Sequence, residues 1–125
     1  MKNQPTEGEL AILQLLWDRG PLTVREVHDI ISADKKTTYT TTLKMMQIMN
    51  EKKLLGRNSR GRSHVYHANV DQKKTTQGLL NRFMDLTFGG SASKLVMQLL
   101  GSSKTDEEEL EKIRELLDDY EKNKN

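Results

Sequence analysis

Residues 35–44, KKTTYTTTLK, carry short polar and basic side chains of the kind that contact DNA in its major groove. If this segment opens a helix, Thr40, Thr41 and Lys44 project away from the face that contains Thr42. Threonine methyls can contact thymine methyls, and a lysine there can donate to O6 and N7 of guanine. The spacing therefore predicts that Thr40, Thr41 and Lys44 contact bases.

A second basic group lies in residues 57–62, where Arg57, Arg60 and Arg62 accompany a Gly-containing turn. A hairpin of this kind can follow the DNA backbone or enter a narrow minor groove. The lysines and amides at the start of the preceding helix can hold phosphates, since charge and helix dipole act together there. Seven side chains are predicted to contact the DNA backbone: Lys35, Lys36, Thr38, Tyr39, Arg57, Arg60 and Arg62.

The positive charge of the chain is concentrated in the stretch that contains both basic groups. Residues 35–64 hold eight lysines and arginines and a single acid, Glu51, although the formal net charge of the 125 residues is only +2. A local basic stretch in a nearly neutral chain indicates contact with a polyanion. The alternative, a charged face that only contacts solvent, also remains compatible with the charge pattern. It explains the threonines less well, because β-branched residues weaken an exposed helix.

Catalysis and metal binding find little support in the residue types. The chain has no cysteine, which excludes disulfides, thiolate metal sites and cysteine nucleophiles. Its histidines are His28, His64 and His67, and the odd spacing of the last two sends them to opposite faces of a strand. The phosphate-binding and nucleophile motifs of common enzymes are missing as well. We therefore predict that the chain is not an enzyme and has no metal or cofactor.

Three predicted helices must position the threonine-rich segment. Residues 6–9 and 23–26 both have the capping-box pattern, a threonine followed three residues later by a glutamate. The first opens a helix that ends near Arg19, before a Gly-Pro pair, and the second opens a shorter helix. Thr37 or Thr38 caps a third helix running to about Lys53, with an apolar face that includes its methionines.

After the third helix the pattern becomes that of strands. Residues 54–59 and 63–68 flank an Arg-Gly-Arg turn and predict a β-hairpin, and residues 21–23 predict a short extended segment. The order helix, short strand, helix, helix, hairpin is that of a winged helix-turn-helix. We therefore predict a mainly α fold with a small β wing, whose DNA-binding domain occupies residues 1–70.

Residues 71–125 predict three amphipathic helices whose apolar faces need a partner. These helices could fold back on residues 1–70, but pairing with a second copy buries more apolar surface. We therefore predict a helical dimerisation region and a homodimer. The predicted interface residues are Leu79, Phe83, Leu95, Leu99, Leu110, Ile113, Leu116 and Leu117.

The predicted cellular compartment follows from the lack of membrane-spanning and signal-peptide patterns in the sequence. No apolar run approaches the roughly 18 residues of a membrane span, and residues 1–5 lack a signal-peptide core. We expect a cytoplasmic protein that does not contact membranes.

In several motifs this chain resembles the penicillinase repressor family, the BlaI/MecI/CopY group of winged-helix repressors. The motifs follow the family's order and spacing along nearly the whole chain. They are PTEGE at 5–9 with LW at 16–17, TVREV at 23–27, TYTTTL at 38–43, EKKLL at 51–55, GRSHVY at 61–66 and FGGS at 88–91.

This resemblance implies a homodimer that joins through its C-terminal helices and binds a pseudo-palindromic operator with TACA and TGTA half-sites. It implies repression of resistance genes for β-lactams or copper, usually with the repressor's own operon. In the β-lactam branch, a membrane sensor and protease system leads to cleavage of the repressor in its C-terminal region.

The chain also departs from that pattern. The copper-responsive branch uses C-terminal cysteines, so copper sensing by that route is excluded here. Where the β-lactam branch is cut at an Asn-Phe bond, this chain offers Gln98-Leu99 as the candidate cleavage bond. Lys53 stands where the family usually has glycine, and Ile48 where an arginine is common.

Two functions follow from these observations. The first is a homodimeric, sequence-specific repressor that occludes a promoter, with a sensor-linked protease as a possible further partner. The second is a winged-helix module that docks an acidic protein partner and has only non-specific affinity for DNA.

Overall fold

The computed structural model describes residues 4–102 and 105–124. Its contacts divide the chain into two compact units, of which the first ends at Leu79 and the second begins at Leu80. This division falls inside helix α4 (Gln72–Phe88), so residues 72–79 of α4 are grouped with the N-terminal elements. Each unit is described by itself.

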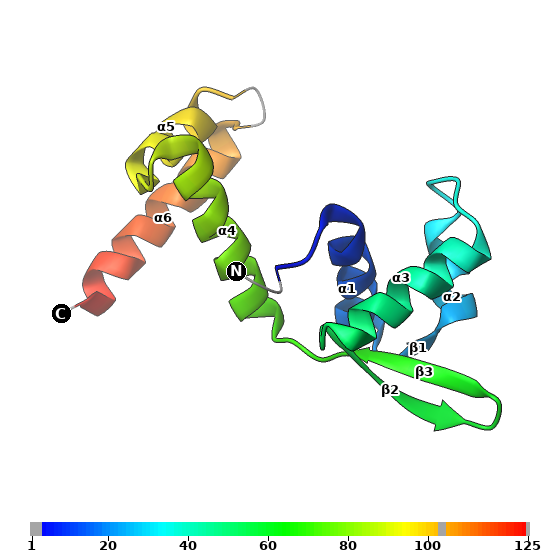
Figure 1. Ribbon diagram of the computed structural model, residues 1–125. Helices are drawn as coiled ribbons and strands as arrows, with labels where there is room; N and C mark the ends of the chain where they lie inside the picture. The colour runs from blue at the N-terminus through cyan, green and yellow to red at the C-terminus, as the bar shows by residue number, and fades with distance from the viewer. Residues whose placement is uncertain (1–3, 103–104, 125) are drawn as a thin grey trace. The chain divides into compact units, whose positions relative to one another are not determined.

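Apart from residues 72–79 of α4, the first unit combines three helices with a small sheet (Figure 1). The sheet is antiparallel with the order β1-β3-β2, so the short strand β1 pairs with β3 at the edge opposite β2. Helices α1 to α3 lie on one side of it, and the β2–β3 hairpin extends beyond them. The elements are α1 (Glu7–Arg19), β1 (Leu22–Thr23), α2 (Val24–Ile31), α3 (Tyr39–Glu51), β2 (Leu55–Arg60) and β3 (Ser63–Ala68).

The first two helices begin as their sequences predict. Thr6 caps α1 and Thr23 caps α2, and each hydroxyl accepts a hydrogen bond from the backbone N–H of the glutamate three residues later. The carboxylates of Glu9 and Glu26 in turn accept a hydrogen bond from the backbone N–H of their own cap residue, which completes both capping boxes. Four donors at two helix starts are satisfied in this way, because a helix leaves its first N–H groups without intrahelical partners.

Helix α3 and the hairpin differ slightly from their predicted bounds. The helix ends at Glu51, and Lys53 has a φ of +70°, in the left-handed region where a helix cannot continue. The hairpin turn contains only Gly61 and Arg62, since Arg60 still pairs with Ser63. Gly61 has a φ of +63°, which a glycine adopts at little cost.

The core of the first unit forms where the three helices meet the sheet. Its side chains are almost fully buried and come from α1, α2, α3, both hairpin strands and the residue just before β2. They are Ile12, Leu13, Leu16, Val24, Val27, Met46, Met49, Leu54, Leu55 and Tyr66. Half-buried Trp17 packs beside them and donates from Nε1 to the carbonyl of Val70 at 3.1 Å, which ties the segment before α4 to α1.

The second unit contains the rest of α4, then α5 (Ala92–Leu100) and α6 (Glu107–Lys124). Ser91 caps α5, and the carboxylate of Asp106 accepts from the backbone N–H of Glu109 at the start of α6. In contrast to the first unit, α4, α5 and α6 contain no buried residue. In the described part of the chain, none of the helices is both long and apolar enough to cross a membrane.

Candidate nucleic-acid interface

The start of α3 is fixed by hydrogen bonds among its own threonines. Thr38 is the N-cap: its hydroxyl accepts from the backbone N–H of Thr41 at 3.1 Å and donates to Thr41 Oγ1 at 2.9 Å. Thr41 Oγ1 therefore accepts one hydrogen bond and keeps its own proton for another acceptor. Of the two cap residues that the sequence left open, the structure selects Thr38.

Thr42 and Tyr39 join α3 to α2. Thr42 is 3% exposed, and its Oγ1 lies 3.1 Å from His28 Nδ1 in a hydrogen bond between the two helices. The Tyr39 ring meets His28 edge-on with 5.7 Å between ring centroids, and the guanidinium of Arg25 lies 4.4 Å from the centroid of the same ring. Tyr39, predicted as a backbone contact, is thus half-buried between two side chains of α2.

The predicted base-contacting residues share the exposed face of α3. Thr40, Thr41 and Lys44 are all exposed, whereas Thr42 on the other side of the helix is buried. The three residues line one shallow hollow together with Met45 and Ile48. Their hydroxyl, ammonium and methyl groups are the kinds of group that contact base edges in the major groove.

A second hollow, of about 240 Å³, lies between the helices and the hairpin. Arg25 contributes from α2, Gln47 from α3, and Arg62 and His64 from the hairpin. Two guanidiniums on one hollow suit a phosphate group. Sequence reasoning found Arg62 but missed Arg25, Gln47 and His64, because nothing in the local pattern shows that α2 and the hairpin line one surface.

The remaining basic residues of the hairpin point in different directions. Arg57 Nη1 donates to the hydroxyl of buried Tyr66 at 3.3 Å, in register with its cross-strand partner. Arg60 lies next to the turn and is exposed. Because side chains alternate along a strand, Arg57 and Arg60 belong to opposite faces of β2. The structure therefore does not gather the hairpin arginines on one face.

Lys35 and Lys36 are exposed in the turn before α3. Lys35 lines a further hollow with Thr37, Thr41 and Glu7, on the side of α3 that faces α1. Both lysines lie shortly before the start of α3, where the helix dipole favours an anion.

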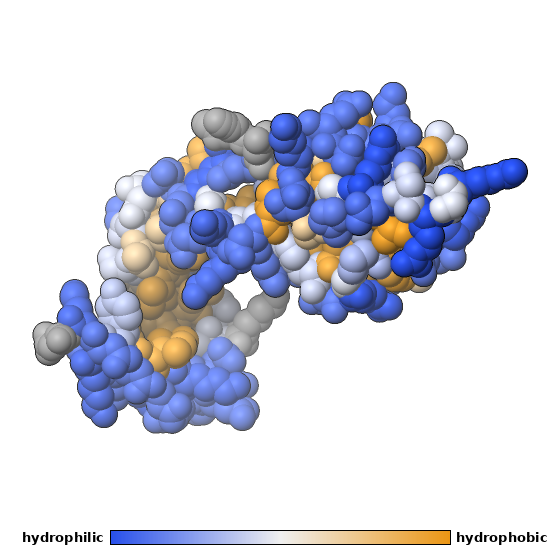
Figure 2. All heavy atoms as spheres, turned by 90° about the horizontal axis from the view of Figure 1, so that it is seen from below, coloured by the Kyte–Doolittle hydropathy of each residue, from blue (hydrophilic) through white to orange (hydrophobic). Residues whose placement is uncertain are grey.

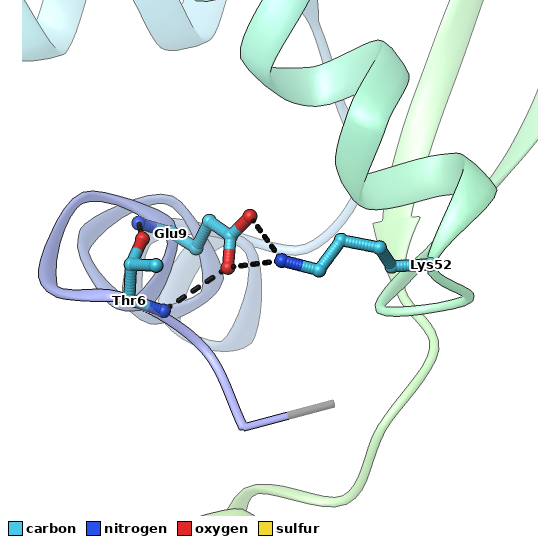
Figure 3. Close-up of polar contacts among 3 residues, drawn as sticks. All are labelled: Thr6, Glu9 and Lys52. Carbon is cyan, nitrogen blue, oxygen red and sulfur yellow. Dashed lines mark hydrogen bonds and ion pairs between the residues drawn. The ribbon is translucent and has the colours of Figure 1, made fainter. Parts of the chain in front are cut away.

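Lys52 is one of the basic residues of the 35–64 stretch, but its ammonium group forms an ion pair within the fold. Its Nζ contacts both carboxylate oxygens of Glu9, at 2.8 and 3.0 Å (Figure 3). Burial by itself raises the pKa of Glu9, but hydrogen bonds from Lys52 and Thr6 outweigh it and lower the pKa below its ordinary value. This pair neutralises one of the positive charges of the basic stretch.

The predicted dimer residues expose much of their apolar surface. Phe83, Leu99, Leu116 and Leu117 are exposed, with Leu116 at 67% and Leu117 at 59%. The other four residues of this set, Leu79, Leu95, Leu110 and Ile113, are half-buried. Figure 2 shows apolar surface among hydrophilic side chains over the C-terminal helices. Within the described residues, no group of three or more histidine or acidic side chains could hold a metal ion.

The sequence of this chain matches the penicillinase repressor family over residues 5–119. A penicillinase repressor of Bacillus licheniformis is 21% identical over 121 residues, which are 97% of this chain and 94% of that protein. A transcriptional regulator BlaI of Mycobacterium tuberculosis is 33% identical over 73 residues, 58% of this chain and 53% of that protein.

Solved structures show the same fold for the N-terminal part. The solution structure of the DNA-binding domain of the repressor BlaI gives a TM-score of 0.51 at 26% identity, and covers 58% of this chain and 90% of that domain. The solution structure of the monomeric form of Bacillus licheniformis BlaI, in complex with the blaP half-operator, gives a TM-score of 0.50 at 25% identity. It covers 58% of this chain and 92% of that chain.

These likenesses confirm the predicted winged-helix fold of the N-terminal part, and the structure shows the helices that follow it. The relatives are repressors and transcriptional regulators, which are not enzymes, in agreement with the residue types. The family that the sequence motifs resemble is the one that the comparisons show. The chain therefore belongs to the penicillinase repressor family.

Proposed function

We propose that this chain is a transcriptional repressor that binds double-stranded operator DNA as a homodimer. The observation that carries the proposal is the exposed face of α3, where Thr40, Thr41 and Lys44 share one surface. The neighbouring hollow, lined by Arg25 and Arg62, offers the positive charge that a phosphate backbone needs. The BlaI structure in complex with a half-operator supports the proposal, because its fold matches this unit.

In this proposal α3 enters the major groove and the hairpin follows the backbone. Thr40, Thr41 and Lys44 contact base edges. Lys35 and Lys36 contact phosphates at the start of α3, and the hairpin arginines add further phosphate contacts. The bound repressor occludes the promoter, and this activity places the chain in the cytoplasm with the chromosome.

Homodimerisation would bury the apolar faces of the C-terminal helices, and the symmetry of the dimer would match that of a two-fold operator. The apolar faces of α4, α5 and α6 contain no buried residue in the single chain, and a second copy would cover them with the same faces. A two-fold dimer presents two copies of α3, so its operator is pseudo-palindromic with one half-site for each copy.

Fluorescence anisotropy at about 150 mM salt tests this proposal with two labelled duplexes. One carries paired TACA and TGTA half-sites, and the other has the same composition in scrambled order. We expect the first duplex to bind at least about 10³-fold more tightly, the ratio usual for specific binders. Equal and weak binding to both duplexes would contradict the proposal and favour the protein-interaction module.

Proteolytic relief of repression is a further part of the proposal. The candidate bond, Gln98-Leu99, lies near the end of α5, and both residues are exposed. A sensor-linked protease would need this last turn to unfold locally, which is easiest at a helix end. Mass spectrometry of the chain from cells exposed to a β-lactam should then find a fragment that ends at Gln98. Relief of repression with an intact chain would contradict this route.

A further inference from the structure

Ile48 is an apolar residue in a place where the fold does not need one. It is 39% exposed and lies on the same side of α3 as Lys44, one turn earlier. The other exposed large hydrophobic side chains of the described residues all belong to the second unit, where a partner copy is proposed to cover them. Ile48 is thus the one such side chain in the described part of the DNA-binding unit.

The surroundings of Ile48 form a shallow hollow on the outer face of α3. Thr40, Thr41, Lys44 and Met45 line it together with Ile48. The accessible lining is mostly carbon, although these residues lie in the most basic stretch of the chain. An apolar hollow within a basic surface suits a ligand that is a polyanion overall and presents one apolar group at this point.

We propose that this hollow receives the C5 methyl group of a thymine and that Ile48 is a specificity-determining residue. The inference rests on the proposed function, since it names what the exposed face of α3 recognises. The thymine methyl is the apolar group that base pairs present in the major groove, whose other recognition groups there are hydrogen-bond donors and acceptors. Cytosine, which lacks this methyl and presents an amino group, would leave Ile48 against a polar edge.

The size of the effect follows from the methyl group alone. Burying one methyl group away from water contributes about 0.8 kcal/mol to the binding free energy, which corresponds to roughly a fourfold change in affinity. Uracil differs from thymine only by this methyl and keeps the same hydrogen-bonding groups. A duplex in which one thymine is replaced by deoxyuridine therefore measures the methyl contact without other changes.

The experiment measures anisotropy on the duplex with paired TACA and TGTA half-sites. Each half-site thymine and each adjacent one is replaced by deoxyuridine in turn. We expect at least one position at which the replacement weakens binding of the unchanged protein by roughly three- to fivefold. With the Ile48→Ala variant, the same replacement should change affinity by less than about twofold, because the contact between Ile48 and the methyl is already lost.

Arg60→Ala is the matched control, because a phosphate contact does not distinguish thymine from uracil. This variant should bind every duplex more weakly and keep the full uracil penalty. Thermal unfolding and sedimentation of Ile48→Ala show whether folding and self-association are preserved, as expected for an exposed residue outside the C-terminal helices.

The outcomes separate this inference from the proposed function. Specific binding without any uracil penalty, or with an equal penalty in Ile48→Ala, would overturn the inference and leave the repressor proposal in place. A loss of self-association in Ile48→Ala would also overturn it, by assigning the residue to a protein contact. Equal affinity for the half-site and scrambled duplexes would contradict both proposals.

Discussion

Lys52, at the C-cap of α3, and Glu9, in the first turn of α1, form an ion pair in which Nζ lies 2.8 Å from Oε2 and 3.0 Å from Oε1. The same carboxylate accepts from the backbone N–H of Thr6 at 3.0 Å. Glu9 thus completes the cap of one helix and holds the end of another. The side chain of Glu9 is 7% exposed and that of Lys52 is 34% exposed, so this pair is more shielded than an ordinary surface ion pair.

Glu9→Gln tests what the ion pair contributes to stability. Glutamine keeps an oxygen that can accept from Thr6, but it removes the charge that holds Lys52. We expect the free energy of unfolding to fall by about 1–3 kcal/mol in urea denaturation. Glu26→Gln is the control, because Glu26 has the same capping-box role in α2 but is exposed. Equal losses in both variants would show that the cap, and not the ion pair, is what Glu9 supplies.

The lowered pKa of Glu9 predicts a dependence of stability on pH. Burial raises this pKa, but the hydrogen bonds from Lys52 and Thr6 bring it below the ordinary value of 4.5. A carboxyl group with a lowered pKa in the fold stabilises it above the ordinary value, and this stability is lost as the pH falls through the folded pKa. Urea denaturation between neutral pH and pH values below 4.5 should therefore show a smaller acid loss in Glu9→Gln than in the unchanged protein. Parallel acid profiles would contradict this assignment.

Lys53→Gly should stabilise the protein. Lys53 has a φ of +70°, and a side chain in this region costs on the order of 1 kcal/mol, which glycine avoids. The gain is reduced by the greater freedom of glycine in the unfolded chain. We expect a net gain of about 0.5 kcal/mol or more by thermal unfolding. Lys53→Ala removes the same charge but keeps the strain, so a similar gain in this variant would assign the effect to charge.

Thr38→Ala should weaken the start of α3. The Thr38 hydroxyl accepts from the Thr41 N–H and donates to the Thr41 hydroxyl, so the substitution removes both contacts. Loss of an N-cap threonine costs about 1 kcal/mol of stability, measured by urea denaturation. Thr40→Ala, in the first turn of the same helix, is expected to lower operator affinity with little change in stability. The assignment of the cap is wrong if the two variants lose stability equally.

Lys44→Ala and Arg60→Ala should weaken DNA binding in different ways. Lys44 is proposed to contact a base, so its loss should cost about 1–3 kcal/mol on the half-site duplex and much less on the scrambled one. Arg60 is proposed to contact a phosphate, so its loss should weaken both duplexes alike and reduce the salt slope by about 1. Anisotropy titrations at several salt concentrations measure both effects. An unchanged affinity ratio in Lys44→Ala would remove this residue from the base-contacting set.

Leu116→Asp should break the proposed self-association. Leu116 is 67% exposed in the single chain, and burying an aspartate in a dimer interface is costly without a partner charge. Sedimentation equilibrium should show a shift toward monomer, accompanied by weaker operator binding. Lys122→Asp introduces the same side chain away from the apolar stripe of α6 and should leave the proposed dimer intact. An intact dimer in Leu116→Asp would exclude Leu116 from the interface.

The sequence by itself determined the features that depend on neighbouring residues. Both capping boxes span four residues, so the starts of α1 and α2 could be predicted from local pattern alone. The apolar periodicity separated the buried face of α3 from the face of Thr40 and Lys44, because a helix repeats every 3.6 residues. The change to an alternating pattern likewise predicted the hairpin within about a residue at each end.

Only the tertiary structure decided which distant side chains share a surface. Lys52 lies 43 residues from Glu9, and its use in an internal ion pair could not be told from its place in a basic stretch. Arg25 belongs to the candidate interface because α2 and the hairpin line one hollow together with α3. The left-handed conformation of Lys53 arises where α3 must end and the chain must turn into β2. Such contacts depend on how the elements pack, and local sequence patterns carry no information about packing between distant elements.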